Sequence, residues 1–521
     1  MTRWFVLVCL KLAVCYLFSY NSVLSSLIPI VTHFLSDRIV MTGTGNNFNQ
    51  VHHCKKLQNK RYISMVDDGN KHNEAKVLYL LSLLGKKPQQ TGDLDDDSDY
   101  SDIILTRMNL MLPNKLITDS HWFEPTRILV EDDDFVSPTS EAQHDVEESV
   151  IQSYEDNHQM NFNLDNHIKY IENSLSHPLP AGYIAYDANH TWMIYWLTNS
   201  YNLIVPNCQF LQSNRVLVKE KIASCIINDG KGGIGGGANQ FGHLASAYAA
   251  ILTLVSIKEY SLLQQIRGNL YAWIMSLKLP DGSFKMHYNG ESDTRSTYCA
   301  LIISSLLNIQ TPKLLFKCRE YLNSCQTFEG GFSGVPGTEA HGGYTFCALA
   351  SYFLLYNDKF EFYSQESFNL NALIRWATMQ QYQLEGGLAG RTNKLVDACY
   401  SFWIGGCYAM LETLTDTPNS SLFSRIGLKN YILRCCQNKS GGFKDKPGKP
   451  VDFYHTNYTL CGLSICEHEL KLNNNLDMLA YTFESSNIDK NQVTAPLNPV
   501  FGLPLGLGEA CKVHFTKPKD H

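Results

Sequence analysis

The sequence has no excess of positive charge and few cysteines for its length. Lysine and arginine number 43 against 50 aspartates and glutamates in 521 residues, a net charge of −7, which excludes nucleic acid as the main partner. The 16 cysteines are too dilute for a disulfide scaffold, and Cys435 and Cys436 are adjacent, so a reducing, cytoplasmic location is predicted. Hydrophobic residues at 44% and charged residues at 18% exclude global disorder.

An apolar run opens the chain. Trp4 to Val31 contains one charged residue, Lys11. Its length suits a bilayer span or a targeting segment, and a buried helix or an extension without a role in the fold are the alternatives. Acidic stretches at 93–102 and 131–134 are typical of solvated, poorly ordered chain or of contacts with basic partners. Residues 1–137 are therefore predicted to be a largely disordered N-terminal extension, and membrane contact through it is left open.

From about residue 147 onward, helical periodicity dominates and the alternation typical of strands is rare. Glycine-rich turns recur about every 50 residues, which is the size of a helix pair with its loops. They stand at 231–235, 281–284, 329–332, 385–388 and 440–443. An apolar helix is predicted after each turn, over 243–257, 295–309, 343–355, 399–414 and 456–470. If the repeats close into a ring, these helices start at one common end.

Polar side chains gather at these helix starts: Arg295, His341, Arg391, Lys394, Asp397, Cys399, Asp452 and His455. An aspartate there can be only a helix cap, but cations at a helix N-terminus are electrostatically unfavourable. Their clustering is explained if a multiply charged anion binds between them. Arginine, lysine and histidine at this end therefore predict a diphosphate site.

Three members of this group, Asp397, Cys399 and His455, are chemically suited to bind zinc. Three protein ligands leave a fourth position open, which is the pattern of a catalytic rather than a structural zinc site. Asp-x-Cys and a distant histidine also occur by chance, so the spacing alone leaves both readings open. Their placement at equivalent ends of neighbouring repeat helices favours the metal site.

Aromatic residues accompany the same helices. Trp192 and Trp196 lie four residues apart on one predicted helix face. The others follow the helix starts: Tyr298, Tyr344, Phe346, Tyr400, Phe402, Trp403, Tyr454 and Tyr458. Core packing explains some of them, and the functional alternative is a cavity for a long apolar ligand. A diphosphate site above such a cavity indicates an isoprenoid diphosphate.

At these residues the chain resembles the β subunits of protein farnesyltransferases, from about residue 137 to the C-terminus. The matching stretches are 281–284, 325–326 with 329–331, 334–337, 339–347, 393–403, 445–449 and 452–456. The resemblance implies an all-α fold for residues 138–521, an α/α barrel of six inner and six outer helices. It also implies an obligate α subunit that completes a heterodimer.

The resemblance further implies the roles of individual residues. One zinc ion would bind to Asp397, Cys399 and His455. The implied diphosphate residues are His341, Arg391, Lys394 and Tyr400, and Lys394 and Tyr400 join the zinc ligands as catalytic residues. The implied isoprenoid cavity comprises Trp192, Trp196, Arg295, Tyr298, Tyr344, Cys347, Trp403 and Tyr458. The implied peptide site comprises Trp192, Trp196, His243, Ala245 and Tyr454.

The reaction that the resemblance implies is farnesyl transfer from farnesyl diphosphate to the cysteine thiol of a C-terminal CaaX box, on proteins such as small GTPases. Zinc would stabilise the attacking thiolate. Trp192, Tyr454 and Tyr458 match the farnesyl pattern, and Asp445 resembles the carboxylate that holds Mg²⁺ on the diphosphate. Ser246 stands where proline is usual, so the preference for the last residue of the box is left open.

Three other classes are weighed against this reading. A type I geranylgeranyltransferase β subunit is disfavoured by Trp192 and Tyr458. A non-catalytic α/α toroid that only binds other proteins would be expected to have a broken ligand set, whereas the set here is intact. A terpene cyclase-like toroid would be expected to carry an Asp-Asp-x-x-Asp or Asp-x-Asp-Asp motif inside the repeats, which this sequence lacks.

Overall fold

The structure is a computed structural model that describes residues 136–158, 161–205, 209–227, 232–364, 367–415, 421–473 and 478–516. All described residues belong to one of the two units of the chain, Asp97–His521. The apolar run 4–31 and both acidic stretches lie outside the described residues. The boundary at residue 137 thus stays a prediction. No helix in the described ranges is both long and apolar enough to span a bilayer.

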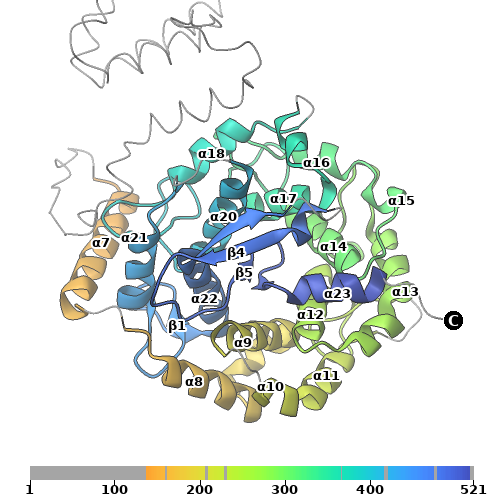
Figure 1. Ribbon diagram of the computed structural model, residues 1–521, viewed down its shortest axis with the longest axis horizontal. Coiled ribbons are helices and arrows are strands. Elements are labelled where there is room, and N and C mark those ends of the chain that lie inside the picture. Colours follow the sequence, from red (N-terminus) through yellow and green to blue (C-terminus); the bar gives the residue numbers. More distant parts are fainter. Residues whose placement is uncertain are drawn as a thin grey trace, which may run out of the picture. The chain divides into compact units, whose positions relative to one another are not determined.

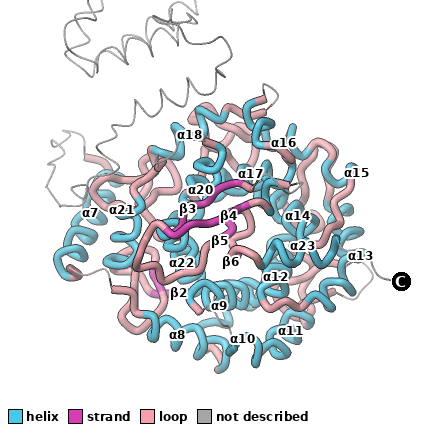
Figure 2. The backbone as a smooth tube through the Cα atoms, in the orientation of Figure 1, coloured by secondary structure: helices cyan, strands magenta, loops and turns pink. Residues whose placement is uncertain are grey.

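The described residues form two concentric rings of helices (Figures 1 and 2). The inner positions are occupied by α9 (His190–Ile204), α12 (Leu244–Ser256), α14 (Thr294–Leu306), α17 (Gly342–Leu355), α19 (Tyr400–Trp403) with α20 (Gly405–Leu414), and α22 (Phe453–Glu467). Each inner helix contacts the next, and α22 contacts α9, so the ring is closed. The predicted α/α barrel is confirmed.

Further helices cover the inner ring from outside. They are α7 (Pro138–Asp156), α8 (Leu164–Ser176), α10 (Gln209–Ser213), α11 (Arg215–Ala223), α13 (Tyr260–Leu277), α15 (Pro312–Leu315), α16 (Cys318–Ser324), α18 (Leu370–Thr378) and α21 (Arg425–Asn430), which continues into η5 (Tyr431–Cys436). In α18 the buried residues Leu370, Leu373, Ile374 and Ala377 share one face, whereas α12 is buried on nearly all sides. Amphipathic outer helices around apolar inner helices therefore give two layers.

A repeated backbone hydrogen bond joins successive repeats at the start of the inner helices. The amide at or just before each helix start donates to a carbonyl in the glycine-rich segment of the next repeat, at 2.8–3.0 Å. The pairs are His190 to Gly236, Leu244 to Met286, Thr294 to Gly334, Gly342 to Gly390 and Ala398 to Asp445. These bonds satisfy amides that have no partner within their own helix and fix all the helix starts at one end of the barrel.

The glycines of these turns allow close contact with the outer helices. Gly330 has φ +112°, and a Cβ there would lie 2.0 Å from the carbonyl oxygen of Ala372 in α18. At Gly282, which has φ +104°, an added Cβ would lie 1.9 Å from the Lys317 carbonyl oxygen. Only glycine combines this backbone conformation with the absence of a side chain, which explains why the turns recur in the sequence.

The other end of the barrel is covered by the C-terminal region. β3 (His468–Leu472) pairs antiparallel with β4 (Phe483–Asn487), with Leu470 opposite Ser485. β5 (Leu497–Asn498) pairs with β6 (Leu503–Pro504), and α23 (Leu507–Thr516) packs against α12 and α14. These elements cross the middle of the ring in Figure 1. The remaining short elements are β1 (Phe443–Lys444), β2 (Val451–Asp452), η3 (Ala181–Asn189), η4 (Lys359–Tyr363) and η6 (Leu479–Tyr481).

Two of the predicted helix ranges were wrong in detail. The helix expected over 399–414 is split into α19 and α20 at Ile404, directly before Gly405 and Gly406, and a glycine pair weakens a helix at that point. The helix expected over 456–470 begins at Phe453 and ends at Glu467, and the following residues form β3. Glu467 is fully buried and pairs with Lys429 at 2.7 Å, a tertiary contact that helical periodicity cannot predict.

Helix α7 is attached to the barrel through a buried carboxyl group, Glu385. Gln143 Nε2 donates to Glu385 Oε1 at 2.6 Å, and the Tyr154 hydroxyl donates to the Glu385 carbonyl oxygen at 2.5 Å. Burial, with a smaller contribution from Glu147, raises the pKa of Glu385 to about 7. The side chain is 1% exposed, so its ionisation is penalised in the folded state.

We expect the contribution of Glu385 to the free energy of unfolding to fall by up to about 3 kcal/mol as the pH rises from about 4.5 to about 7. Unfolding returns the Glu385 carboxyl to its ordinary pKa, so raising the pH through this range favours the unfolded chain. Glu385→Gln keeps the acceptor for Gln143 and removes the charge. Melting temperatures measured at about pH 5 and about pH 8 should therefore differ less in Glu385→Gln than in the wild type, and an equal difference would contradict the assignment.

Candidate active site

The end of the barrel where the inner helices start brings Asp397, Cys399 and His455 together. One potential ligand atom of each residue lies within 4.8 Å of the other two. Asp397 and Cys399 directly precede α19, and His455 lies in the first turn of α22, which contacts α19. The backbone amide of Cys399 donates to Asp397 Oδ1 at 2.8 Å. The fold thus places a carboxylate, a thiol and an imidazole close enough to bind one ion, and these three residues form the metal group.

The His455 imidazole is oriented by Asp452, the N-cap of α22. Asp452 Oδ1 accepts the backbone amide of His455 at 2.7 Å, and Oδ2 accepts the Nδ1 proton at 2.7 Å. Nε2 is buried, has no hydrogen-bond partner among the described residues and lies 3.2 Å from Asp397 Oδ1. Without a bound ion, a proton on Nε2 offsets the Asp397 carboxylate, and a metal cation could take the place of that proton, so the donor set fits a metal ion.

The electrostatics of this group favour a positive charge. Burial opposes ionisation of His455, but Asp397 and Asp452 raise the pKa of the imidazole to about 9. Burial and the neighbouring Asp397 carboxylate raise the pKa of the Cys399 thiol well above its ordinary value. A cation among these residues would reverse that effect and favour the thiolate.

His341 and Tyr400 form a second polar group at the same end. The His341 Nδ1 accepts the backbone amide of Gly343 at 3.0 Å, and Nε2 lies 3.1 Å from the Tyr400 hydroxyl. Burial and the charge of Arg391 lower the pKa of His341 to about 4, so the ring is neutral near pH 7. Nε2 must then carry the proton and donate to the Tyr400 oxygen, which leaves the Tyr400 O–H to donate to another acceptor.

The predicted cations differ in their partners. Arg391 Nη1 pairs with Glu339 Oε2 at 3.1 Å, and both side chains are partly exposed. Lys394 is exposed, and its amine forms no ion pair with any described residue. Arg295 is held by Asp293, the N-cap of α14, through Nε at 3.1 Å and Nη2 at 2.5 Å. These positive charges stand at helix starts with only part of their charge compensated.

Asp445, the predicted magnesium ligand, lies beside the metal group rather than within it. Its backbone carbonyl accepts the Ala398 amide at 2.9 Å, and its side chain pairs with Lys446. Burial and the nearby Asp397 raise the pKa of the Asp445 carboxyl. Its place in the loop before β2 therefore brings the carboxylate close to the start of α19.

The aromatic side chains form a continuous belt inside the barrel, with one member or more from each inner helix. Ring centroids of neighbours lie 4.4–6.1 Å apart. The belt consists of Trp192, Tyr195 and Trp196 in α9, Tyr248 in α12, Tyr298 in α14, Phe346 in α17, Phe402 and Trp403 in α19, and Tyr454 and Tyr458 in α22. Trp403 Nε1 donates to the Tyr454 hydroxyl at 2.9 Å. The belt links the metal group to the barrel interior.

The remaining predicted site residues occupy the rim and wall of the barrel. Tyr344 lies near His341, with ring centroids 5.2 Å apart, and under the guanidinium of Arg295. Cys347 is buried one helical turn after Tyr344. His243 caps α12 by accepting the Ala245 amide at 3.3 Å, and its ring stacks on His287. His243 and Ala245 thus lie two inner helices away from α17 and the His341 group.

Three residues matter to this geometry beyond their predicted roles. Asp452, expected at most as a cap, also orients His455. Glu339 pairs with Arg391. Gly390 leaves room for Tyr400, because a Cβ there would lie 1.9 Å from the Tyr400 ring. Of these, only Asp452 had a signal in the sequence: the Asp-x-x-His spacing at a helix start.

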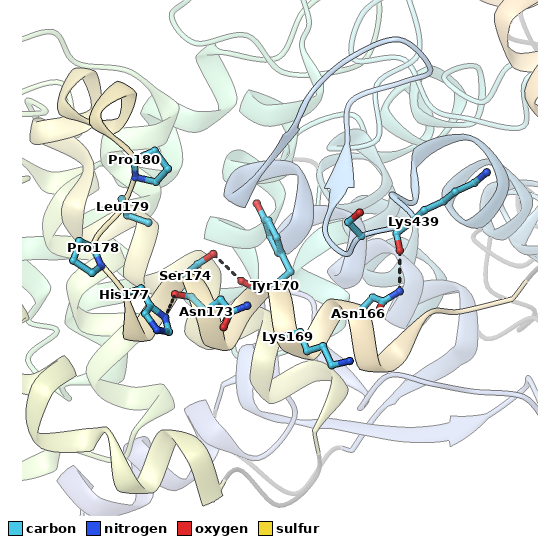
Figure 3. Close-up of a pocket in the computed structure, with 11 residues that line it drawn as sticks. Asn166, Lys169, Tyr170, Asn173, Ser174, His177, Pro178, Leu179, Pro180 and Lys439 are labelled. Atoms are coloured by element: carbon cyan, nitrogen blue, oxygen red, sulfur yellow. Dashed lines mark hydrogen bonds between the residues drawn. The ribbon is translucent and has the colours of Figure 1, made fainter.

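A separate hollow of about 560 Å³ lies on the outer surface along α8 (Figure 3). Its polar side chains bind backbone carbonyls: Asn166 donates to Lys439, Ser174 donates to Tyr170, and His177 Nδ1 lies 3.2 Å from the Asn173 oxygen. None of the predicted site residues lines it. The candidate active site is therefore the end of the barrel where the inner helices start.

Comparisons with known proteins agree with this architecture. The family profile described as the prenyltransferase alpha-alpha toroid domain matches residues 162–503. The structure of Candida albicans protein geranylgeranyltransferase-I complexed with GGPP superposes with a TM-score of 0.55 at 23% identity, covering 69% of this chain and 100% of that one. The chain is a prenyltransferase-type α/α toroid.

Relatives of known sequence narrow this class. A protein farnesyltransferase subunit beta from Schizosaccharomyces pombe is 38% identical over 371 residues, 69% of this chain and 92% of its own. The subunit of the same name from Saccharomyces cerevisiae is 39% identical over 379 residues, 70% of this chain and 84% of its own. The chain belongs to the family of protein farnesyltransferase β subunits, which are β subunits of protein prenyltransferases.

Proposed function

We propose that the chain is the catalytic β subunit of a zinc-dependent protein farnesyltransferase. With an α subunit it would transfer the farnesyl group of farnesyl diphosphate to the cysteine thiol of a C-terminal CaaX box, on substrates such as small GTPases. The observation that carries the proposal is the cluster of Asp397, Cys399 and His455, whose potential ligand atoms all lie within 4.8 Å of one another. The described cysteines are free and buried, which supports a cytoplasmic location.

Asp397, Cys399 and His455 would hold the zinc ion, and Asp452 would orient His455 from behind. When bound, zinc lowers the pKa of a thiol that enters its open position and so supplies a thiolate near neutral pH. The three side chains approach from α22 and from the residues just before α19. Their positions are set by backbone hydrogen bonds and helix caps rather than by flexible side chains, which keeps the site pre-organised.

The diphosphate would lie against His341, Tyr400, Arg391 and Lys394. The bond between C1 of the isoprenoid and the diphosphate oxygen breaks as the new C–S bond forms, and negative charge develops on the leaving group. The Tyr400 O–H, oriented by His341 Nε2, can donate a hydrogen bond to that charge, and Arg391 and Lys394 supply positive charge. Asp445 would hold Mg²⁺ against the diphosphate, since hard oxygen ligands suit this ion.

The isoprenoid chain would extend from this group along the aromatic belt, past Arg295, Tyr298, Tyr344 and Cys347. Trp192 and Tyr458 would limit its length, which supports farnesyl rather than geranylgeranyl. Trp192, Trp196, Tyr454, His243 and Ala245 would contact the CaaX peptide. Tyr454 connects the two sites, because its ring packs on Trp196 at 5.5 Å and its hydroxyl accepts from Trp403.

A competition assay tests the proposal. The chain is co-expressed with a farnesyltransferase α subunit and given a CaaX peptide with equimolar farnesyl and geranylgeranyl diphosphate, with and without a zinc chelator. Farnesyl transfer that the chelator abolishes is the expected result. Preferred geranylgeranyl transfer would overturn the assignment of Trp192 and Tyr458. Transfer of neither group to the peptide would overturn the proposed reaction.

We expect Asp452→Asn to weaken zinc binding by about 10- to 100-fold. Asparagine keeps an oxygen to cap α22 but removes the carboxylate that holds the Nδ1 proton of His455. Zinc affinity measured against a competing chelator would show the loss, and excess zinc should restore transfer. Asp293→Asn, at the N-cap of α14, is the matched control and should leave zinc affinity unchanged. Equal zinc affinity in Asp452→Asn and the wild type would contradict this role.

A further inference from the structure

A short C-terminal loop, residues 498–502, is hydrogen-bonded to the inner helices. The Gly502 carbonyl accepts from Asn199 Nδ2 at 2.8 Å and from the Tyr195 hydroxyl at 3.1 Å. The Val500 carbonyl accepts from the Tyr298 hydroxyl at 2.7 Å. Tyr195 and Tyr298 belong to the aromatic belt, so the loop is attached to the same side chains that line the proposed isoprenoid path.

The loop is also rigid in itself. Asn498 Oδ1 accepts the backbone amides of Val500 and Phe501 at 3.0 and 3.3 Å. Asn498 Nδ2 donates to Glu509 Oε1 in α23 and to the Ala480 carbonyl, both at 2.9 Å. Val500, Phe501 and Asn498 are fully buried. Because the loop is hydrogen-bonded both to the inner helices and to α23, it can limit the movement of side chains that pack on it.

Gly502 meets the belt at Phe402. A Cβ at Gly502 would lie 3.2 Å from Phe402 Cζ and 3.2 Å from the Tyr195 hydroxyl, and Gly502 has φ +68°. The Phe402 ring also stacks on Tyr458, with centroids 5.4 Å apart and an interplanar angle of 23°. Loop, Phe402 and Tyr458 therefore form one continuous contact.

The Tyr458 ring is packed among other aromatic rings. Its buried hydroxyl lies near the Trp196 indole. The ring contacts Phe402, Trp403 and Tyr454. Trp403 and Tyr454 are joined by a hydrogen bond, and Phe402 is the one of the three rings that also lies beside Gly502.

We propose that the loop 498–502, acting through Phe402, is a positioning element for Tyr458 and thereby sets the length of isoprenoid chain that the barrel accepts. This inference rests on the proposed farnesyl transfer. Phe402 is a positioning residue: its ring is buried and packs on Gly502, Phe346, Trp403 and Tyr458, and it would act on the isoprenoid path through Tyr458. Chain-length selectivity then depends on the C-terminal region as well as on the inner helices.

Phe402→Leu tests the proposal because it removes ring atoms between Gly502 and Tyr458. In the heterodimer we expect the ratio of kcat/KM for geranylgeranyl to farnesyl diphosphate to rise about tenfold, the effect of a modest gain in room in an apolar site. Phe353→Leu is the matched control: Phe353 is equally buried but packs on Phe362 and Phe483. An unchanged ratio in Phe402→Leu, or the same rise in both variants, would overturn the proposal.

Gly502→Ala provides a second test should Phe402→Leu fail to fold. The added methyl presses Phe402 towards Tyr458, so the ratio should fall instead of rise, and an unchanged ratio would count against the loop. Equilibrium dialysis of both diphosphates against wild type and variants gives the same ratio without turnover. If the wild type transfers neither group, the proposed function fails. An unchanged ratio of geranylgeranyl to farnesyl diphosphate affinity in the variants would separately overturn the role of the loop.

Discussion

Cys399→Ser should lower transfer to the CaaX thiol by about 10³-fold or more and remove most of the bound zinc. A catalytic metal supplies several kcal/mol, and each factor of ten in rate requires about 1.4 kcal/mol. Cys399 is 4% exposed and shares its position with Asp397 and His455. Serine has a similar size, but its hydroxyl is a much poorer zinc ligand than a thiolate. The substitution therefore removes a zinc ligand while preserving the packing.

The metal content of the purified heterodimer is the decisive measurement, because it reports on the site without catalysis. Cys466→Ser is the matched control: Cys466 is also 4% exposed but lies near the far end of α22. It should keep one zinc per β subunit and most of its activity. If Cys399→Ser retained full zinc and full transfer, the assignment of the metal group would be wrong.

Gly390→Ala should nearly abolish transfer although no reacting group is altered. The new Cβ would lie 1.9 Å from Tyr400 Cζ and 2.2 Å from its hydroxyl oxygen, so the tyrosine ring must leave its place beside His341. Loss of one pre-organised donor to a developing negative charge costs about 10²- to 10³-fold in kcat. We expect Tyr400→Phe to reproduce the loss of kcat, since it removes the same O–H.

Gly268→Ala separates this effect from a general cost of removing glycine. Gly268 lies within α13, with no atom within 4 Å of an added Cβ. Alanine there should stabilise the helix by about 0.5–1 kcal/mol and leave transfer unchanged. Steady-state kinetics with varied farnesyl diphosphate would compare the three variants. Normal kcat in Gly390→Ala would show that Tyr400 is not needed where the structure places it.

The candidate site could be located from the sequence because the repeats carry it. Once the glycine-rich turns fix the repeat, residues just after each turn must fall at one end of the ring, which groups Asp397, Cys399 and His455 there. Their roles as zinc ligands came from the resemblance to farnesyltransferase β subunits. The hydrogen bond between His341 and Tyr400 was not predictable in this way. It joins side chains 59 positions apart in neighbouring repeats, and its geometry depends on the close approach that Gly390 permits.

The elements that the sequence did not predict lie where the repeat ends. Hydrophobic periodicity gave helices but no reason for β3, because the last residues of the expected helix 456–470 alternate too briefly to be distinguished. The position of loop 498–502 depends on hydrogen bonds that its carbonyls accept from Tyr195, Asn199 and Tyr298, and these donors lie far away in the chain. Contacts of that range are set by the closed barrel and not by local sequence.

The backbone bonds that join each repeat to the next have a consequence for how the barrel comes apart. In an open array of repeats the terminal units contact one neighbour only and can fray independently. Here α22 packs on α9, with Asn199 Nδ2 donating to Asn457 Oδ1 at 2.9 Å across the junction. Every repeat of the ring therefore has two neighbours. Opening the ring at any junction exposes two apolar faces at once. The barrel is therefore expected to unfold cooperatively as a whole rather than by fraying from one end.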